Sequence, residues 1–281
     1  GTEWATSSTF PKSDYVLKEG RPLGLVRGLT ADGFYTTDDF TYENGVYTLK
    51  EGVADVSSAV FPNYHLHNGM NERPAGQLAY PGMAKFKDLN DDGIINDDDV
   101  DVIGDMTPVH TGGFNINATY KNFDLGLYFN WSYGNEIYNV NKLAALYGYK
   151  EGAVYENKLS IVKDCYKIYD VVNGELVALT TPEQLNAANA NAKLPLAYSE
   201  NGYVSTLGIE DGSYLRLNTL TLGYTLPKSM LQKAGISNLR VYGSIYNVFT
   251  ITGYSGIDAE VSTSTSTKTY PQLGMDWCTY P

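Results

Sequence analysis

The sequence contains few of the residues from which catalytic and metal centres are most often built. Its 281 residues include 2 cysteines and 3 histidines. Cys165 and Cys278 are far apart and have neither metal-ligand nor redox-motif spacing, so one disulfide and two free thiols both remain open. His65 and His67 would share one face of a strand, but a third ligand for zinc is not evident. Because G-x-S-x-G, H-E-x-x-H and phosphate-loop motifs are also missing, we expect no enzyme.

The sequence is also short of positive charge and of long hydrophobic runs. It has 20 Lys and Arg residues against 32 Asp and Glu residues, which gives a formal net charge of -12. The basic residues are scattered singly, so we expect no nucleic-acid partner, because phosphate binding needs clustered positive charge. No stretch reaches the roughly 18 consecutive apolar residues of a membrane-spanning helix. This excludes helical membrane spans and leaves transmembrane strands open.

What the sequence does contain is a long alternation of apolar and polar residues. The segment from Gly113 to Tyr133, GFNINATYKNFDLGLYFNWSY, has period two on both sides of a short turn at 121–123, and this pattern predicts a β-hairpin. Its second arm has about ten residues, enough to cross a bilayer, and Trp131 and Tyr133 near its end are expected in an interfacial girdle. We expect one face to contact lipid and the other to face a lumen. The lipid set is Phe114, Ile116, Ala118, Leu125, Leu127 and Phe129; the lumen set is Asn115, Asn117, Thr119, Tyr128 and Asn130.

Further strands are predicted in the C-terminal part of the chain. The segments 212–227 and 238–252 are strand candidates, joined by a short connector with about one helical turn. The connections on the other side are long: residues 135–211, with short helices expected at 140–147 and 182–191, and residues 253–277. Short turns on one side and long loops on the other are typical of outer-membrane barrels. The N-terminal third is interpreted as a strand end that enters a long folded loop.

An acidic stretch matches the twelve-residue calcium template of the EF-hand. Starting from Asp88, the template positions one, three, five, seven, nine and twelve fall on oxygen-bearing groups, and Gly93 stands at position six, where the loop turns sharply. Asp99 is shorter than the usual glutamate, and no helix-forming segment precedes the loop, so an Asx-rich turn that caps its own backbone is the alternative. The candidate Ca²⁺ ligands are Asp88, Asn90, Asp92, Ile94, Asn96 and Asp99.

The order of these stretches resembles a known family. YVLKEGRPLG, ADGFYTTDDF, PGMAKFKDLNDDGIINDDDVDVIGDMTPVHTGGFN, SYLRLNTLTLGYTLPKSML and LRVYGSIYNVFTITGYSGIDAE follow one another as in the C-terminal third of SusC/RagA-type TonB-linked outer-membrane transporters of Bacteroidota. The resemblance implies an all-β fold: an antiparallel transmembrane β-barrel portion, residues 1–281, with long extracellular loops. Residues 83–112 would form an acidic extracellular loop with the EF-hand-like segment. The family's plug, TonB box and last strand have no counterpart here, so we expect a fragment.

The resemblance also implies a function. Such transporters import glycans, oligosaccharides or peptides across the bacterial outer membrane, with a SusD-like surface lipoprotein as lid and the TonB complex as energy source. The partners would then be that lipoprotein, the TonB complex, outer-membrane lipid and a glycan or peptide substrate. The alternative from the residues themselves is a secreted, calcium-stabilised, β-rich carbohydrate-binding module, which would explain the acidity and the acidic loop without a membrane.

Overall fold

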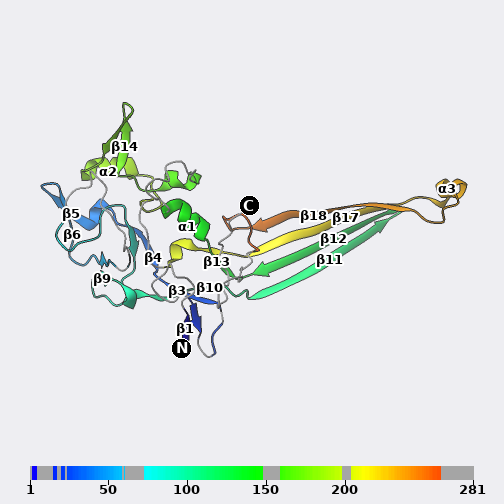
Figure 1. Ribbon diagram of the computed structural model, residues 1–281, viewed down its shortest axis with the longest axis horizontal. Coiled ribbons are helices and arrows are strands. Elements are labelled where there is room, and N and C mark those ends of the chain that lie inside the picture. Colours follow the sequence, from blue (N-terminus) through cyan, green and yellow to red (C-terminus); the bar gives the residue numbers. More distant parts are fainter. Residues whose placement is uncertain are drawn as a thin grey trace.

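The computed structural model describes residues 2–4, 15–17, 20–22, 24–58, 60, 73–147, 159–197 and 204–260. Strands dominate these ranges, and the helices are short. None of the helices in these ranges is long and apolar enough to cross a membrane. Four long strands run as one ribbon to one side, and we call them the long sheet (Figure 1). Apart from the short connector between the last two strands at the tip of this sheet, the shorter elements gather at its other end, and we call residues 24–105 and 159–197 the loop region.

The long sheet confirms the predicted hairpin and both further strands. Its order is β11-β12-β17-β18, and every neighbouring pair is antiparallel. The hairpin begins at His110, earlier than the alternation indicates. Its turn is Lys121 and Asn122 alone, because Phe123 already pairs with Tyr120, and Lys121 takes the positive φ of 52° that a tight hairpin turn requires. The strands are β11 (His110–Tyr120), β12 (Phe123–Tyr133), β17 (Tyr214–Thr225) and β18 (Arg240–Thr252).

The register gives the long sheet one apolar and one polar face across all four strands. Leu127 pairs with Ile116 on one side and Leu220 on the other, and Leu220 pairs with Ile245, so apolar residues form continuous rows. Bulges insert extra residues into β17 and β18, and Asn247 in β18 adopts a φ of 50°. On both sides of the bulges the apolar residues stay on the same face of the sheet. The apolar face includes Phe114, Ile116, Ala118, Leu125, Leu127, Phe129, Leu215, Leu217, Leu220, Leu222, Val241, Ile245, Phe249 and Ile251.

The loop region is built from small sheets. Two of its strands, β3 and β10, pair with each other and join β1 and β2 in a four-stranded sheet, while the others form two-stranded pairs. This agrees with the sequence interpretation of a strand end followed by a folded loop. The elements are β1 (Thr2–Trp4), β2 (Tyr15–Leu17), β3 (Leu25–Gly28), β4 (Ala31–Phe34), η1 (Thr37–Asp39), β5 (Phe40–Glu43), β6 (Val46–Leu49), β7 (Asp55–Val56), β8 (Ala84–Phe86), β9 (Ile94–Ile95), η2 (Asp97–Asp99) and β10 (Asp101–Asp105).

The connection between β12 and β17 contains the two predicted helices. The first has the expected bounds, and the second ends at Asn189, two residues early, which is the usual uncertainty of a helix end. Thr181 and Gln184 form a capping box at the start of the second helix, a signal visible in the sequence. The elements are β13 (Glu136–Tyr138), α1 (Val140–Tyr147), η3 (Ser160–Asp164), β14 (Tyr169–Val172), β15 (Glu175–Ala178), α2 (Pro182–Asn189), η4 (Thr206–Gly208) and β16 (Ile209–Asp211). The connector after β17 contains α3 (Lys228–Leu231) and η5 (Gln232–Ala234).

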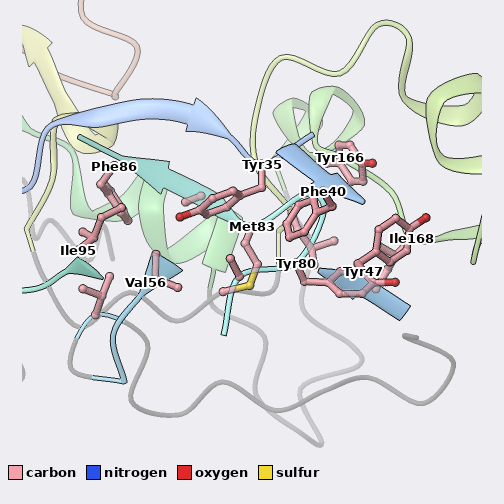
Figure 2. Close-up of a cluster of buried hydrophobic side chains, with 14 of the residues drawn as sticks. Tyr35, Phe40, Tyr47, Val56, Tyr80, Met83, Phe86, Ile95, Tyr166 and Ile168 are labelled. Atoms are coloured by element: carbon pink, nitrogen blue, oxygen red, sulfur yellow. The ribbon is translucent and has the colours of Figure 1, made fainter. Parts of the chain in front are cut away.

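Aromatic side chains form the core of the loop region (Figure 2). Tyr35, Tyr47 and Tyr80 have no exposed surface, and the rings of Tyr47 and Tyr80 meet edge to face with centroids 5.4 Å apart. Two of these hydroxyls have carbonyl partners: Tyr35 donates to the carbonyl of Ala54 at 2.6 Å, and Tyr47 donates to that of Thr180 at 3.1 Å. Buried tyrosine thus contributes apolar area while its hydroxyl holds a second segment in place. The core joins residues 29–95 to residues 166–196.

Candidate functional site

The polar face of the long sheet contains a shallow concavity of about 400 Å³. Its floor lies at Gly126, where a Cβ atom would meet only Asn117 Oδ1, at 3.4 Å. Tyr128, which is 42% exposed, lies two residues after Gly126 on β12, and Asp124 lies two residues before it. On either side of β12 the neighbouring strands β11 and β17 present amides and hydroxyls: Asn115, Asn117, Thr119, Thr219 and Thr221.

An ion pair bounds the concavity on the side of the two-residue turn. Arg240 Nε donates to Asp124 Oδ1 at 2.9 Å, and Arg240 Nη2 donates to the other oxygen of the same carboxylate. The guanidinium carbon also lies 4.8 Å from the centroid of the Tyr242 ring. This two-point geometry fixes the direction of both side chains. Because both remain open to solvent, the pair positions these groups more than it stabilises the fold.

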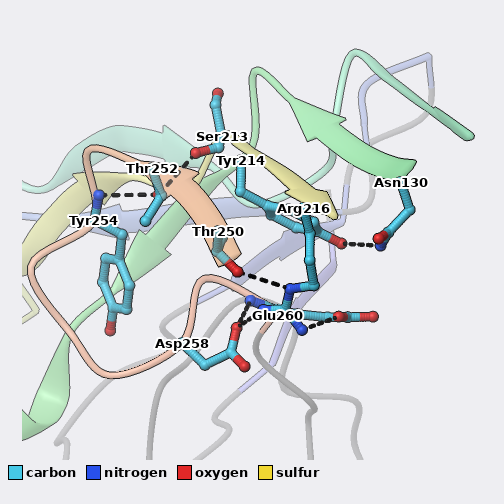
Figure 3. Close-up of polar contacts among 9 residues, drawn as sticks. All are labelled: Asn130, Ser213, Tyr214, Arg216, Thr250, Thr252, Tyr254, Asp258 and Glu260. Atoms are coloured by element: carbon cyan, nitrogen blue, oxygen red, sulfur yellow. Dashed lines mark hydrogen bonds and ion pairs between the residues drawn. The ribbon is translucent and has the colours of Figure 1, made fainter. Parts of the chain in front are cut away.

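A second charge cluster, centred on Arg216, lies towards the opposite end of the sheet (Figure 3). Arg216 is 8% exposed, although it stands on the polar face of β17. Its Nε donates to Thr250 Oγ1 at 3.0 Å, its Nη1 donates to Glu260 Oε2 at 2.8 Å, and its Nη2 donates to Asp258. The guanidinium carbon lies 5.5 Å from the centroid of the Tyr214 ring. Two carboxylates therefore surround one buried guanidinium.

Glu210 forms a third cluster beside the end of β18. It accepts hydrogen bonds from Lys142 Nζ at 2.7 Å and from both the N–H and the Oγ of Ser255, each at 2.8 Å. Burial acts to raise the pKa of Glu210, but the hydrogen bonds from Lys142 and Ser255 and the Lys142 charge outweigh it and hold the pKa below its ordinary value. The carboxylate therefore links α1 to the chain that follows β18.

The last two clusters hold one segment, residues 253–260, which we call the rim segment. Glu210 binds it at Ser255, and Arg216 binds it at Asp258 and Glu260. Next to these points Tyr254 and Ala259 are buried, 6% and 3% exposed, in a small cluster with Ile137. The rim segment is thus fixed at the end of the long sheet opposite the two-residue turn.

Sequence reasoning missed these three clusters, although it located the long strands that carry the first two; Glu210 lies in β16, inside the expected long connection 135–211. The signal is present: the four long strands contain only three residues of formal charge, Asp124, Arg216 and Arg240. A single charge in an otherwise neutral strand of a transmembrane sheet is costly on the lipid face and is expected on the other. All three lie on the polar face.

The acidic stretch folds into a turn whose side chains hold its own backbone. Asp88 accepts hydrogen bonds from the N–H groups of Asp92 and Gly93, at 3.3 and 2.7 Å. Asn90 Oδ1 accepts from the Asp92 N–H at 3.1 Å, and Asp92 Oδ1 accepts from the Ile94 N–H at 2.8 Å. Gly93 has a φ of 84°, which permits the sharp turn. These contacts are those of the Asx-rich turn.

Asp99, at the twelfth position of the calcium template, has no exposed surface. Its Oδ1 accepts from the Leu89 N–H at 2.7 Å and its Oδ2 from the Asn96 N–H at 2.8 Å, while Asn96 Oδ1 accepts from the Asp98 N–H at 2.7 Å. Within the described ranges, no three His, Cys, Asp or Glu side chains are grouped so that they could hold a metal ion. The six candidate ligands have the oxygen chemistry that calcium prefers, and calcium binding at them stays a prediction.

Trp131 and Tyr133 lie at the end of β12 and in the rows of the apolar face, and their place in an interfacial girdle stays a prediction. Trp131 Nε1 donates to His110 Nδ1 at 3.0 Å, and the rings of His110 and Tyr133 stack with centroids 5.1 Å apart. His110 was missed from the sequence because the alternation was followed only from Gly113. These side chains have an apolar body and a polar edge, which suits the boundary between lipid and water.

The cysteines and the other histidines supply no site in the described residues. Cys165 is buried, and burial, with the nearby Asp164 charge, raises the pKa of its thiol to about 11, so it is a poor nucleophile. His65, His67 and Cys278 lie outside the described residues.

Comparison with known proteins relates the chain to outer-membrane receptors. The sequence matches no family model. It is 30% identical over 271 residues to TonB-dependent receptor P3 of Formosa agariphila, a match that covers 95% of this chain and 22% of the relative. It is 32% identical over 114 residues to TonB-dependent receptor SusC of Bacteroides thetaiotaomicron, which covers 38% of this chain and 11% of SusC. The structure resembles that of the RagAB peptide transporter, with a TM-score of 0.55, 19% identity, and coverage of 89% of this chain and 21% of that one.

The long two-faced sheet and these relatives define the class: an antiparallel transmembrane β-barrel portion of the bacterial outer membrane, with long loops. Within this class the chain is homologous to part of a SusC/RagA-type TonB-dependent transporter, which confirms the resemblance found in the sequence. The chain spans about a fifth of the length of the curated relatives it matches over most of its residues.

Proposed function

We propose that the protein containing this chain imports glycans, oligosaccharides or peptides across the outer membrane, in complex with a SusD-like surface lipoprotein and with energy from the TonB complex. The observation that carries the proposal is the two-faced long sheet. Its lipid-facing rows contain no formal charge, while all three charges of its strands lie on the other face. A wall of this kind separates lipid from a polar passage.

The exposed apolar face argues against a secreted binding module. Ile116, Ile245 and Ile251 are 46%, 57% and 61% exposed, and they belong to rows that run across the sheet. Patches of this extent on a water-soluble protein would cause association. Lipid removes this cost, and it also explains why the strands are twice the usual length.

The loop region supplies the surface for the surface lipoprotein. It lies at the end of the long sheet opposite the short turns, which is the extracellular side in outer-membrane barrels. Its own aromatic core gives it a fixed shape rather than a set of separate loops. A fixed surface is what a lid needs if it is to dock repeatedly in one position.

The test uses the full-length transporter in its native membrane. Uptake of labelled oligosaccharides and oligopeptides is measured with and without a functional TonB complex, and the transporter is purified to identify the lipoprotein bound to it. We expect uptake of one class that disappears without TonB and a co-purifying lipoprotein. Uptake of neither class above the level of a strain lacking the transporter would contradict the proposal.

A further inference from the structure

We propose that the rim segment is folded inward over the polar face of the long sheet and limits the size of the molecules that enter the passage, and that Arg216 is the positioning residue that holds it there. The inference rests on the proposed import function and deepens it, because it assigns the upper size limit of import to one segment and one side chain. It follows from the path of the chain after β18, from the face over which this path lies, and from the contacts that hold it.

The chain turns back over the sheet after β18 ends. The guanidinium of Arg216 on β17 contacts Thr250, near the end of β18, and it also contacts Asp258 and Glu260 of the rim segment (Figure 3). An extended rim segment would carry Glu260 about 25 Å beyond the end of the strand. The segment instead returns to the level of Thr250, on the side of the sheet to which Arg216 points.

The side over which the rim segment folds is the polar face. Arg216 belongs to this face, as do the other two charges of the strands. The opposite face contains the apolar rows that meet lipid, so the polar face lines the passage of the barrel. The connections at this end of the sheet are long, which is typical of the extracellular side. A layer of chain packed on a sheet takes up about 10 Å in front of it, so the rim segment narrows the extracellular mouth.

Apolar packing gives the rim segment its shape. Tyr254 and Ala259 are buried in a cluster with Ile137, and the ring of Tyr214 on β17 packs against this cluster. A Cβ atom at Gly256 would meet the ring of Tyr254, so the turn between the two buried residues has no room for a side chain there. Each of these contacts joins two parts of the same chain and is independent of the remainder of the barrel.

The contacts of Arg216 decide whether the rim segment stays over the polar face. The arginine is itself fixed from the sheet, because Thr250 accepts a hydrogen bond from its Nε and the Tyr214 ring lies 5.5 Å from its guanidinium carbon. Asp258 and Glu260 are then held by the two remaining nitrogens. Loss of hydrogen bonds to a charged group should raise the fraction of released segments about 10-fold or more. Long oligomers are admitted in proportion to that fraction, whereas short ones pass the held segment.

The experiment measures uptake as a function of oligomer length by cells that carry the full-length transporter with its lipoprotein. The probes are labelled oligosaccharides and labelled oligopeptides, each from trimers to dodecamers. The variants are Arg216→Ala, the isosteric pair Asp258→Asn with Glu260→Gln, and all three substitutions together. Arg240→Ala is the matched control, because it removes a guanidinium from the same face at the other end of the sheet. Uptake is divided by the amount of transporter at the cell surface, which corrects for any loss of folding.

We expect the ratio of dodecamer to trimer uptake to rise about 10-fold in Arg216→Ala and in the Asp258→Asn, Glu260→Gln variant. The three substitutions together should raise it no further, since both sides belong to one contact. Arg240→Ala should keep the wild-type ratio. An unchanged ratio in both sets of variants, or an equal fall in the uptake of short and long oligomers, would overturn the inference and leave the import function intact. TonB-dependent uptake of no probe by the wild type would instead reject the import function, and this inference with it.

Discussion

Tyrosine occupies opposite environments in the two regions of this molecule. In the loop region Tyr35, Tyr47 and Tyr80 are fully buried, and burial raises the pKa of the first two hydroxyls. In the long sheet Tyr120 and Tyr246 are 71% and 69% exposed. The loop region gains its stability by burying aromatic rings within one chain, as a water-facing domain does. The long sheet leaves its apolar side chains outward, which is stable only where lipid covers them.

The largest effect should come from the loop core. Tyr47→Ala removes a ring packed between Phe40 and Tyr80 together with the hydrogen bond that its hydroxyl donates to the Thr180 carbonyl. We expect a loss of about 3 to 5 kcal/mol in the stability of the loop region. Tyr120→Ala in the long sheet should cost far less. Thermal unfolding of the detergent-purified transporter, monitored by proteolysis of the loop region, measures the stability of both variants. Similar losses of stability in the two variants would mean that the two regions do not differ as described.

The next effect concerns the two faces of one strand. Leu127→Arg places a charge among the apolar rows, next to Ile116 and Leu220, and should cost about 2 to 4 kcal/mol if the residue lies near the bilayer midplane. Tyr128→Arg, one residue later, points to the polar face and should cost less. Refolding into lipid vesicles under a urea titration gives both values. Equal losses at the two positions would reject the assignment of lipid and lumen.

A smaller difference is expected between variants of the two ion clusters of the polar face. Arg216→Ala removes the buried guanidinium that holds Asp258 and Glu260, and should loosen the rim segment by about 1 to 3 kcal/mol. Arg240→Ala removes the more exposed arginine and should leave that segment unchanged. A spin label at Ile257→Cys, a site 74% exposed within the rim segment, reports the mobility. A rim segment that stays rigid without Arg216 would show that the buried Tyr254 suffices to hold it.

What the sequence could predict follows from the range of each interaction. The alternation of β11 and β12 depends only on neighbouring residues, so the sequence predicts the two faces and the hairpin. Local sequence patterns likewise predict both helices. The contacts of Arg216 with Glu260 and of Glu210 with Ser255 join residues 44 and 45 positions apart, and no local period marks them. The bulges in β17 and β18 were missed for the same reason: an inserted residue is defined only by the partner strand.

The Glu210 cluster, which also holds the rim segment, predicts a pH dependence. The pKa of Glu210 is lower in the folded protein than its ordinary value of about 4.3, so its stabilising effect is fully present above that pH and is lost as the pH falls through the folded value. The Ile257→Cys label should therefore become more mobile below about pH 4, and Glu210→Gln should give a mobility that no longer changes in this range. An unchanged pH response in Glu210→Gln would assign the transition to other groups.

The smallest and most local effect tests calcium at the acidic turn, which we propose as a Ca²⁺ site. The backbone contacts of Asp88 and Asp92 do not exclude an ion, because a carboxylate oxygen that accepts one N–H keeps a further lone pair. If calcium binds, it should protect the turn of the full-length transporter from protease, and a chelator should remove the protection. Asp88→Ala and Asp92→Ala each delete a template anion and should abolish the difference. Asp97→Ala, at a template position that supplies no ligand, should preserve it. If neither calcium nor the Asp92→Ala substitution changes the rate of cleavage, the turn is held by its own hydrogen bonds alone. This part of the loop region, like its tyrosine core, would then depend only on contacts within the chain.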